Sequence, residues 1–200
     1  KQDTVRHVNE YTSVDLEMGY IKSFEDIMQM EVRMLKYTID ELKENYKHEL
    51  ELLNVDLPAI EGIPSIKFME AKELIAGEYN REIKDYEDFE PEEEKLLSEF
   101  IKKHTASDFV FVTHYPSKKR PFYTMDDPNN PSETLSFDLL FRGLEITTGG
   151  QRIHNYNEQL SKMQQRNMNI SLFDSYLMLH KYGIPPHGGL GLGLERFTCK

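Results

Sequence analysis

The stretch LSFDLLFRGLEITTGGQRIH, residues 135–154, restricts the fold of this chain more than any other. Residues 137–141 and 144–148 have the composition of β-strands, and Arg142-Gly143 has the length of a two-residue hairpin turn. Because side chains alternate across a strand, this hairpin would place four of them on one face: Asp138, Leu140, Glu145 and Thr147. The sequence therefore predicts an antiparallel hairpin with one acidic face.

Two acids of this face, Asp138 and Glu145, would be diagonal neighbours about 7–8 Å apart at the backbone. Carboxylates at that separation can bind a Mg²⁺ ion that also contacts phosphate. The alternative is a hairpin whose acids are simply exposed to solvent, and the hairpin alone favours that alternative.

The residues after the hairpin favour a ligand site over solvent-exposed acids. Gly149 and Gly150 interrupt the strand and allow other groups to approach the backbone closely, and Arg152 and His154 follow directly. A guanidinium group fits a carboxylate or a phosphate, although a single Arg after a Gly pair is more often structural or part of a surface ion pair. Because this Arg follows two acids on the same hairpin, the segment outlines a ligand site.

The composition bounds the class of protein. With 200 residues and 38% hydrophobic content the chain can bury one substantial core, and its net charge of −11 argues against a generally basic nucleic-acid surface. The single cysteine, Cys199, excludes an internal disulfide and is typical of a reducing compartment. Neither a membrane-spanning run nor a signal peptide is recognisable, so we expect a soluble cytoplasmic protein with no membrane partner.

A second alternating segment occupies residues 10–21. Thr12, Val14, Leu16 and Met18 would form a core face, whereas the opposite face suits a polar cleft and carries Tyr11, Ser13, Asp15 and Glu17. An ordinary half-exposed strand is the alternative interpretation, and Arg6 and His7 lie in the polar segment before it.

The other predicted elements alternate between helices and strands. A long amphipathic helix starts at Ser23, where Asp26 completes a pattern resembling a capping box, and continues to about Leu53. Residues 108–114, DFVFVTH, are apolar enough for a buried strand. Shorter elements are a strand at 65–68 and helices at 69–76, 91–103, 154–166 and 171–182.

Three segments between these elements are polar. Residues 77–94 are mostly charged and predict a solvated, mobile connection. Residues 116–121, PSKKRP, predict an exposed basic loop, with a nucleic-acid or phosphate contact by Arg120 or its lysine neighbours as the alternative. Residues 126–131 predict a turn-rich loop.

The C-terminal run KYGIPPHGGLGLGLERFTCK combines glycines with alternating leucines. Its glycines allow close backbone approach, and Leu190, Leu192 and Leu194 predict a buried strand that leads into a helix near Gly193. Arg196 falls in the first turn of that helix. The spacing is neither that of a P-loop nor that of a dinucleotide-binding fingerprint.

Together, three stretches resemble the catalytic domain of class II aminoacyl-tRNA synthetases, and most of all aspartyl-tRNA synthetases of the archaeal-like type. RHVNEYTSVDLEMGYI is similar to the latter part of motif 2, FDLLFRGLEITTGGQRIH to the metal- and aspartate-binding segment, and KYGIPPHGGLGLGLER to motif 3. The resemblance implies an α+β fold in which helices flank an antiparallel β-sheet. It also implies that residues 1–200 are a catalytic-domain fragment, truncated within motif 2 and within motif 3.

The resemblance assigns roles at the phosphate end of the site. Asp138 and Glu145 match acids that hold Mg²⁺ and the ATP phosphates, and Thr148 matches a hydroxyl ligand of the metal. Strict alternation instead puts Thr147 on that face. Arg196 matches the motif 3 arginine that contacts the γ-phosphate.

The other roles concern aspartate, adenine and the tRNA end. Arg152 matches the residue that binds the aspartate side-chain carboxylate, and Ser13 and Asp15 match substrate-binding positions, with Asp15 facing the α-ammonium group. Tyr11 lies where the family stacks an aromatic ring on adenine. Arg6 and His7 match the motif 2 loop that meets the ATP phosphates and the tRNA end, and with Arg196 they form the expected catalytic set.

The implied reaction is ATP-dependent activation of L-aspartate, with Mg²⁺ as cofactor, and transfer to the 3′ end of tRNA(Asp), with tRNA(Asn) as a further acceptor left open. The implied protein is a homodimer, built through a motif 1 that these residues lack, so we expect the fragment alone not to charge tRNA. Asparaginyl-tRNA synthetase, an asparagine synthetase-like paralogue and a non-catalytic regulatory protein are the alternatives. Asp15, where the asparaginyl family tends to carry Glu, favours aspartate.

Overall fold

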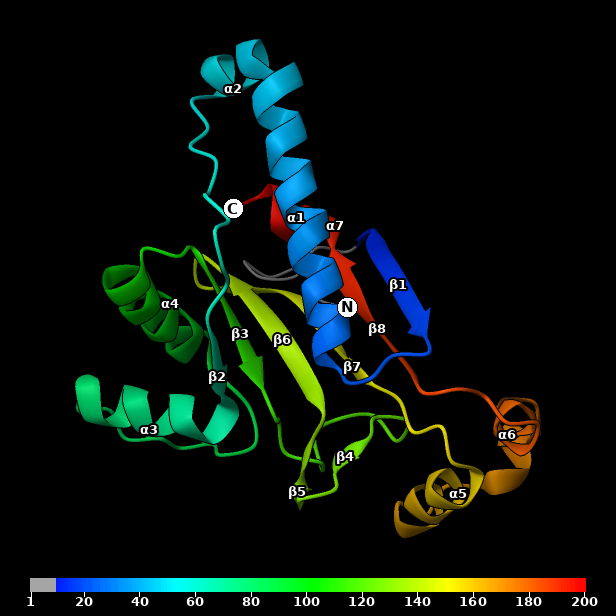
Figure 1. The fold of residues 1–200 in the computed structure, drawn as a ribbon. Coiled ribbons are helices and arrows are strands. Elements are labelled where there is room, and N and C mark those ends of the chain that lie inside the picture. The colour runs from blue at the N-terminus through cyan, green and yellow to red at the C-terminus, as the bar shows by residue number, and fades with distance from the viewer. Residues whose placement is uncertain (1–9) are drawn as a thin grey trace.

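A six-stranded sheet forms the centre of the molecule in a computed structural model that describes residues 10–200 (Figure 1). Neighbouring strands are antiparallel except β2 and β3, which are parallel. The order across the sheet is β1 (Ser13–Gly19), β8 (His187–Gly193), β7 (Leu144–Gln151), β6 (Ser136–Phe141), β3 (Phe109–Thr113) and β2 (Ser65–Lys67). The α+β fold with a mainly antiparallel sheet is therefore confirmed.

Helices cover the sheet on both faces. On one face α1 (Glu25–Asn45) packs Ile27 and Leu35 against the phenylalanines of β3 and β6. On the other face α3 (Phe68–Glu78) and α4 (Pro91–Thr105) pack against Val110, Val112 and Leu140. The remaining helices are α2 (Lys47–Leu53), α5 (Tyr156–Gln165), the 3-10 turn η1 (Ile170–Phe173), α6 (Asp174–Lys181) and α7 (Leu194–Thr198).

Three predicted elements differ from the structure. The helix predicted at 171–182 is divided into η1 and α6. The long helix ends at Asn45, because Tyr46 has non-helical torsion angles (φ −128°, ψ 32°), and α2 follows as a separate helix. The predicted loop at 126–131 instead contributes to a hairpin of β4 (Asp126–Asp127) and β5 (Asn130–Thr134).

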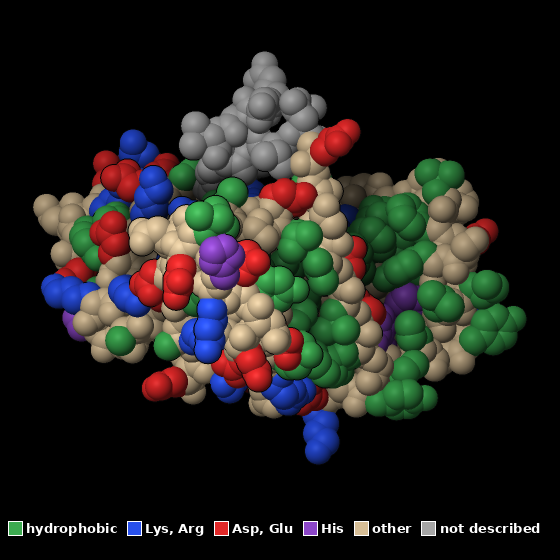
Figure 2. Space-filling model, turned by 90° about the horizontal axis from the view of Figure 1, so that it is seen from above, with side chains coloured by type: hydrophobic (Ala, Val, Ile, Leu, Met, Phe, Trp, Pro, Cys, Tyr) green, Lys and Arg blue, Asp and Glu red, His purple; other side chains and the backbone are tan. Residues whose placement is uncertain are grey.

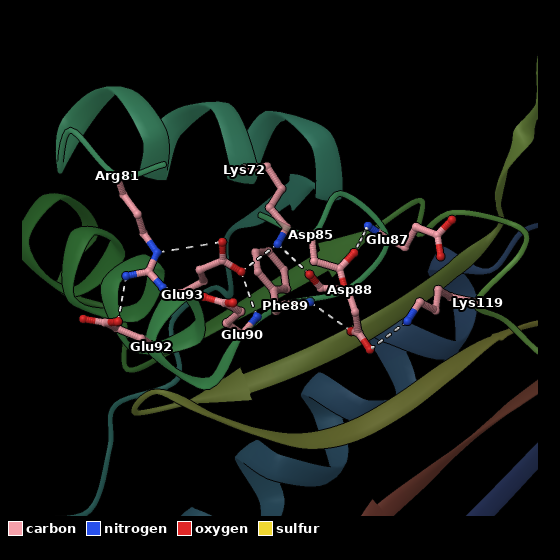
Figure 3. A network of polar contacts seen from close by, with 10 residues as sticks. All are labelled: Lys72, Arg81, Asp85, Glu87, Asp88, Phe89, Glu90, Glu92, Glu93 and Lys119. Carbon is pink, nitrogen blue, oxygen red and sulfur yellow. Dashed lines mark hydrogen bonds and ion pairs between the residues drawn. The ribbon is translucent and has the colours of Figure 1, made fainter. Parts of the chain in front are cut away.

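Most of the charged segment 77–94 is exposed, as predicted, but ion pairs of Arg81 and Glu93 fix it to α3 and α4 (Figure 3). Lys72 is completely buried, and its Nζ lies 2.6 Å from Glu93 Oε2 and 4.7 Å from the centre of the Phe89 ring. Arg81 binds Glu90 and Glu92 at 2.6 and 2.7 Å. The charges of this segment therefore pair with one another across the helices that it connects.

The hairpin of β6 and β7 has the predicted turn, with Arg142 and Gly143 both at positive φ (46° and 80°). Leu140 lies opposite Glu145 as expected, but the register then shifts, because Ile146 is an extra residue in β7. Asp138 consequently lies opposite Thr148, and the prediction that Thr147 shares the face of Asp138 is wrong.

The surface carries both signs of charge. Figure 2 shows acidic and basic side chains intermixed over the end of the molecule seen from above, with hydrophobic side chains gathered on the side of α5 and α6. Leu172, Leu179 and Tyr182 are among the exposed hydrophobic residues there. Within residues 10–200, every helix is too short or too polar to cross a membrane.

Candidate active site

Four side-chain positions form a row across the open part of the sheet. Asp15 on β1 lies opposite Gly191 on β8, Gly191 opposite Thr148 on β7, and Thr148 opposite Asp138 on β6. Because directly opposed residues of a sheet share a face, all four positions point to the same side. The hairpin acids and the N-terminal strand therefore belong to one site.

The β8 glycines leave this face open. Leu190 and Leu192 point to the α1 side and join its core cluster, so the glycines that alternate with them face the site. A Cβ atom at Gly191 would lie 2.9 Å from Asp15 Oδ1. The predicted Leu/Gly alternation is present, although Leu194 begins α7 and is partly exposed, so it is not a core residue of the strand.

A cavity of about 530 Å³ lies over this row. Its walls come from β1, β7, β8 and the segment that precedes β4, and they include Asp15, Glu17, Arg120, Thr148, Arg152 and Gly191. Acidic side chains from β1 and arginines from the other walls thus border the same space.

Asp138 lies close enough to Glu145 for its charge to shift the pKa of the Glu145 carboxyl group. The pKa of Glu145 is raised to about 7, first by burial and then by the charge of Asp138, while Arg196 opposes both. Arg196 Nη1 lies 3.2 Å from Glu145 Oε1 and donates to the Glu145 carbonyl oxygen at 2.8 Å. The three side chains predicted to meet phosphate and metal are therefore neighbours.

Thr148 completes this oxygen-rich corner. Its Oγ1 donates to Glu145 Oε1 at 3.5 Å, and the extra residue Ile146 is what brings it to the face of Asp138. Thr147 is buried on the α1 side instead. Of the two threonines, Thr148 therefore shares the face of Asp138, contrary to strict alternation.

The donor set at this corner fits Mg²⁺. Two carboxylates and a hydroxyl group are hard oxygen ligands. Burial, and after it the charge of Asp138, raises the pKa of Glu145, and a bound cation would favour its ionised form. Within residues 10–200 we find no cluster of three or more His, Cys, Asp or Glu side chains able to hold a metal ion. Mg²⁺ would therefore need further oxygens from the bound phosphates, as is usual for this ion.

Arg152 faces the cavity and is four-fifths buried at its side chain. Its Nε and Nη2 lie 3.3 and 3.4 Å from the two carboxylate oxygens of Glu17, and its guanidinium group lies 5.0 Å from the centre of the Tyr123 ring. The glycine-flanked arginine predicted from the sequence is therefore part of the site.

The N-terminal strand brings the remaining predicted residues to the rim. Ser13 Oγ donates to Asp15 Oδ1 at 2.7 Å, and Tyr11 is 63% exposed just before the strand. Thr12 N donates to the carboxylate of Glu195 at 2.8 and 2.9 Å, which ties β1 to α7. The predicted residues Arg6 and His7 lie outside the described residues.

Sequence reasoning missed one arginine of the site. Arg120 was expected in an exposed loop, but its guanidinium group lies 3.8 Å from the centre of the Tyr115 ring, and its Nη2 lies 2.8 Å from Asp138 Oδ1. Its neighbours Lys118 and Lys119 are exposed as expected. The aromatic pair Phe122-Tyr123, directly after PSKKRP, was the available signal that this loop returns to the core.

Comparison with known proteins identifies the family of this chain. The family model "tRNA synthetases class II (D, K and N)" matches residues 1–200. The chain belongs to this family. Among curated relatives, "Aspartate--tRNA(Asp/Asn) ligase" of Aeropyrum pernix is 44% identical over 98% of this chain and 45% of its own length. "Aspartate--tRNA(Asp) ligase" of Pyrococcus abyssi is 37% identical over all of this chain and 46% of its own length.

Solved structures of the class II synthetases have the same fold. An aspartyl-tRNA synthetase from Entamoeba histolytica superposes with a TM-score of 0.93 at 29% identity, covering 98% of this chain and 41% of that one. An asparaginyl-tRNA synthetase from Pyrococcus horikoshii, complexed with asparaginyl-adenylate, gives a TM-score of 0.88 at 30% identity, covering 100% and 46%. The chain thus spans less than half the length of these class II relatives.

Proposed function

We propose that this chain carries the aspartate-activating site of an ATP-dependent aspartate–tRNA ligase. The observation that carries the proposal is the position of Arg152 and Asp15 on the walls of one cavity. A guanidinium group there suits the side-chain carboxylate of L-aspartate, and a carboxylate suits its α-ammonium group. The names of the relatives, which are aspartate–tRNA ligases at 36–44% identity, support this choice.

The proposed chemistry is adenylation. An α-carboxylate oxygen of aspartate attacks the α-phosphorus of ATP, the bond from that phosphorus to the bridging oxygen breaks, and pyrophosphate leaves with the electron pair. Aspartyl-adenylate remains, and a terminal hydroxyl of tRNA then takes the aspartyl group and releases AMP. The protein contributes alignment and charge stabilisation, so no covalent enzyme intermediate is needed.

Each neighbouring side chain has a part in that scheme. Asp138, Glu145 and Thr148 would hold Mg²⁺, which supplies charge neutralisation at the phosphates when bound. Arg196, which lies 3.2 Å from Glu145, would contact the γ-phosphate. Tyr11 at the rim would stack on adenine, and Ser13 supports Asp15 through their 2.7 Å hydrogen bond. Arg6 and His7 remain proposed contacts of the phosphates and the tRNA end.

The test is amino-acid-dependent ATP–pyrophosphate exchange by the intact protein. We expect exchange with L-aspartate and little with L-asparagine or L-lysine. Arg152→Leu should abolish it, because a buried contact to a charged group is worth roughly 1.5–3 kcal/mol and leaving that group unpaired costs more. Glu73→Gln, on the exposed face of α3, is the control and should behave as the unchanged protein. Exchange with asparagine alone would replace the proposal by asparagine activation.

Asparagine activation is the second candidate, favoured by the 0.88 TM-score to the P. horikoshii asparaginyl-tRNA synthetase. The acceptor is a separate question, because the Aeropyrum relative is named for tRNA(Asp/Asn) and the Pyrococcus abyssi relative for tRNA(Asp). We propose tRNA(Asp) as acceptor for a cytoplasmic homodimer. Aminoacylation of purified tRNA(Asp) and tRNA(Asn) tests the acceptor. Incubation with aspartate, ATP and ammonia tests for asparagine synthesis, and analytical sedimentation tests for the dimer.

A further inference from the structure

Glu17 and Arg152 form a pair that crosses an entire strand. Glu17 lies on β1, Arg152 directly follows the end of β7, and β8 runs between them. The two nitrogens on one side of the guanidinium group, Nε and Nη2, lie 3.3 and 3.4 Å from the two carboxylate oxygens. Such side-on pairing uses one of the two forks of an arginine.

Gly189 makes this crossing possible. It lies opposite Glu17 in the register of β1 and β8, and a Cβ atom built on it would lie 2.0 Å from Glu17 Oε2. The carboxylate of Glu17 therefore fills the space that any other residue at this position would occupy. The glycines of β8 were expected to leave room for a ligand, but at Gly189 a side chain of the same protein occupies that room.

The pairing leaves the other fork of Arg152 for a ligand. Nη1 forms no hydrogen bond or ion pair with the described part of the chain, and together with Nη2 it forms the second fork of the guanidinium group. The Tyr123 ring, 5.0 Å from the guanidinium carbon, supports the group from a further direction. Because Glu17 and Tyr123 already hold the Arg152 side chain, it loses less conformational entropy when a carboxylate binds.

We propose that Glu17 is a positioning residue that holds Arg152 ready for the side-chain carboxylate of the amino-acid substrate. This rests on the proposed function, which assigns that carboxylate to Arg152. Glu17 acts through Arg152 and lies away from the phosphate end of the site, so its loss raises KM for the amino acid and leaves KM for ATP and kcat close to their original values.

The experiment uses Glu17→Ala and Glu17→Gln in the intact protein. Substitutions of Gly189 are unsuitable, because a Cβ atom there would also lie 2.2 Å from the Leu16 carbonyl oxygen and disturb the sheet. In ATP–pyrophosphate exchange, Glu17→Ala raises KM for L-aspartate by about tenfold or more, the size expected for a lost charged hydrogen bond. Glu17→Gln keeps an acceptor oxygen and recovers part of the loss. Glu73→Gln leaves every parameter unchanged.

A crystal structure of Glu17→Ala supplies the second readout. Displacement of the Arg152 guanidinium group from its position beside Tyr123 supports the proposal. An undisplaced Arg152, or a KM for aspartate that stays unchanged while Arg152 moves, overturns it. A lack of aspartate-dependent exchange by the unsubstituted protein defeats the proposed function instead, and the crystal structure then still decides whether Glu17 positions Arg152.

Discussion

Asp138 on β6 lies directly opposite Thr148 on β7, while Leu139 lies opposite Thr147. The extra residue Ile146 produces this register, and it gives two adjacent threonines different surroundings. Thr148 is exposed at the cavity, whereas Thr147 is buried on the α1 side, where its hydroxyl group lowers the pKa of Glu31 against the larger effect of burial.

Replacing each threonine by valine should therefore give opposite results. We expect Thr148→Val to lower aspartate-dependent exchange about tenfold or more at limiting Mg²⁺ with an unfolding free energy within about 0.5 kcal/mol of the original. Thr147→Val should instead lower the unfolding free energy by about 1–3 kcal/mol, because the buried Glu31 carboxyl group loses a polar neighbour. Urea unfolding and exchange assays measure both; the reverse pattern would contradict the register.

Arg120 should matter for activity although it was not predicted as a site residue. It orients Asp138 at 2.8 Å, and removing a group that orients a metal ligand typically costs about 10–100-fold in metal affinity or activity. We expect Arg120→Ala to raise the Mg²⁺ concentration needed for half-maximal exchange by that factor. Lys119→Ala, at the exposed neighbouring position, is the control, and equal effects of the two substitutions would show that only the loop charge matters.

The buried pair of Lys72 and Glu93 should dominate the stability of the α3–α4 layer. Its nitrogen and oxygen lie 2.6 Å apart with both side chains almost fully buried. Removing one partner leaves a buried charge unpaired, so Lys72→Met should lower the unfolding free energy by about 3–5 kcal/mol. Lys36→Met breaks the exposed Lys36–Asp40 pair at 2.7 Å and should cost at most about 1 kcal/mol. If urea unfolding shows that Lys72→Met and Lys36→Met lower the unfolding free energy by similar amounts, the Glu93 charge is solvated.

Local pattern predicted the hairpin and the shared face of Asp138 and Glu145, because strand alternation and the Arg142-Gly143 turn are properties of neighbouring residues. It did not predict the extra residue, since the run Ile146-Thr147-Thr148 shows no break in composition. Local pattern did not predict the burial of Arg120 either. A basic, proline-flanked loop has the composition of a solvated loop, and the partner of Arg120, Asp138, is distant in the sequence.

The same limit applies to charged segments. Residues 77–94 have the composition of a solvated linker, yet their acids pair with Lys72 and Arg81, and such pairing depends on how two helices pack. Glu17 was correctly predicted on the polar face of its strand, but its partner Arg152 depends on the strand order β1-β8-β7, which local periodicity does not specify.

Glu31 gives the fold a calculable pH dependence. Its side chain is fully buried on α1, and its pKa is raised from 4.5 to about 8, chiefly by burial; Thr147 opposes the rise and the charge of Asp138 adds to it. Between these two pKa values the folded protein holds a proton that the unfolded chain has released. The contribution of Glu31 to stability is therefore fully present below about pH 4.5 and is lost as the pH rises to about 8.

Glu31→Gln should remove this dependence, because the amide is neutral at every pH. We expect the unfolding free energy of the variant to rise relative to that of the unsubstituted protein by up to about 1.4 kcal/mol per pH unit between pH 5 and pH 8. Glu41→Gln, at a more accessible position on the same helix, should give a difference that does not change with pH over that range. Urea unfolding of the three proteins at pH 5, 6, 7 and 8 measures these differences. Parallel curves for Glu31→Gln and the unsubstituted protein would mean that Glu31 is ionised in the folded state, so that a cation or a bound water must reach it behind the sheet.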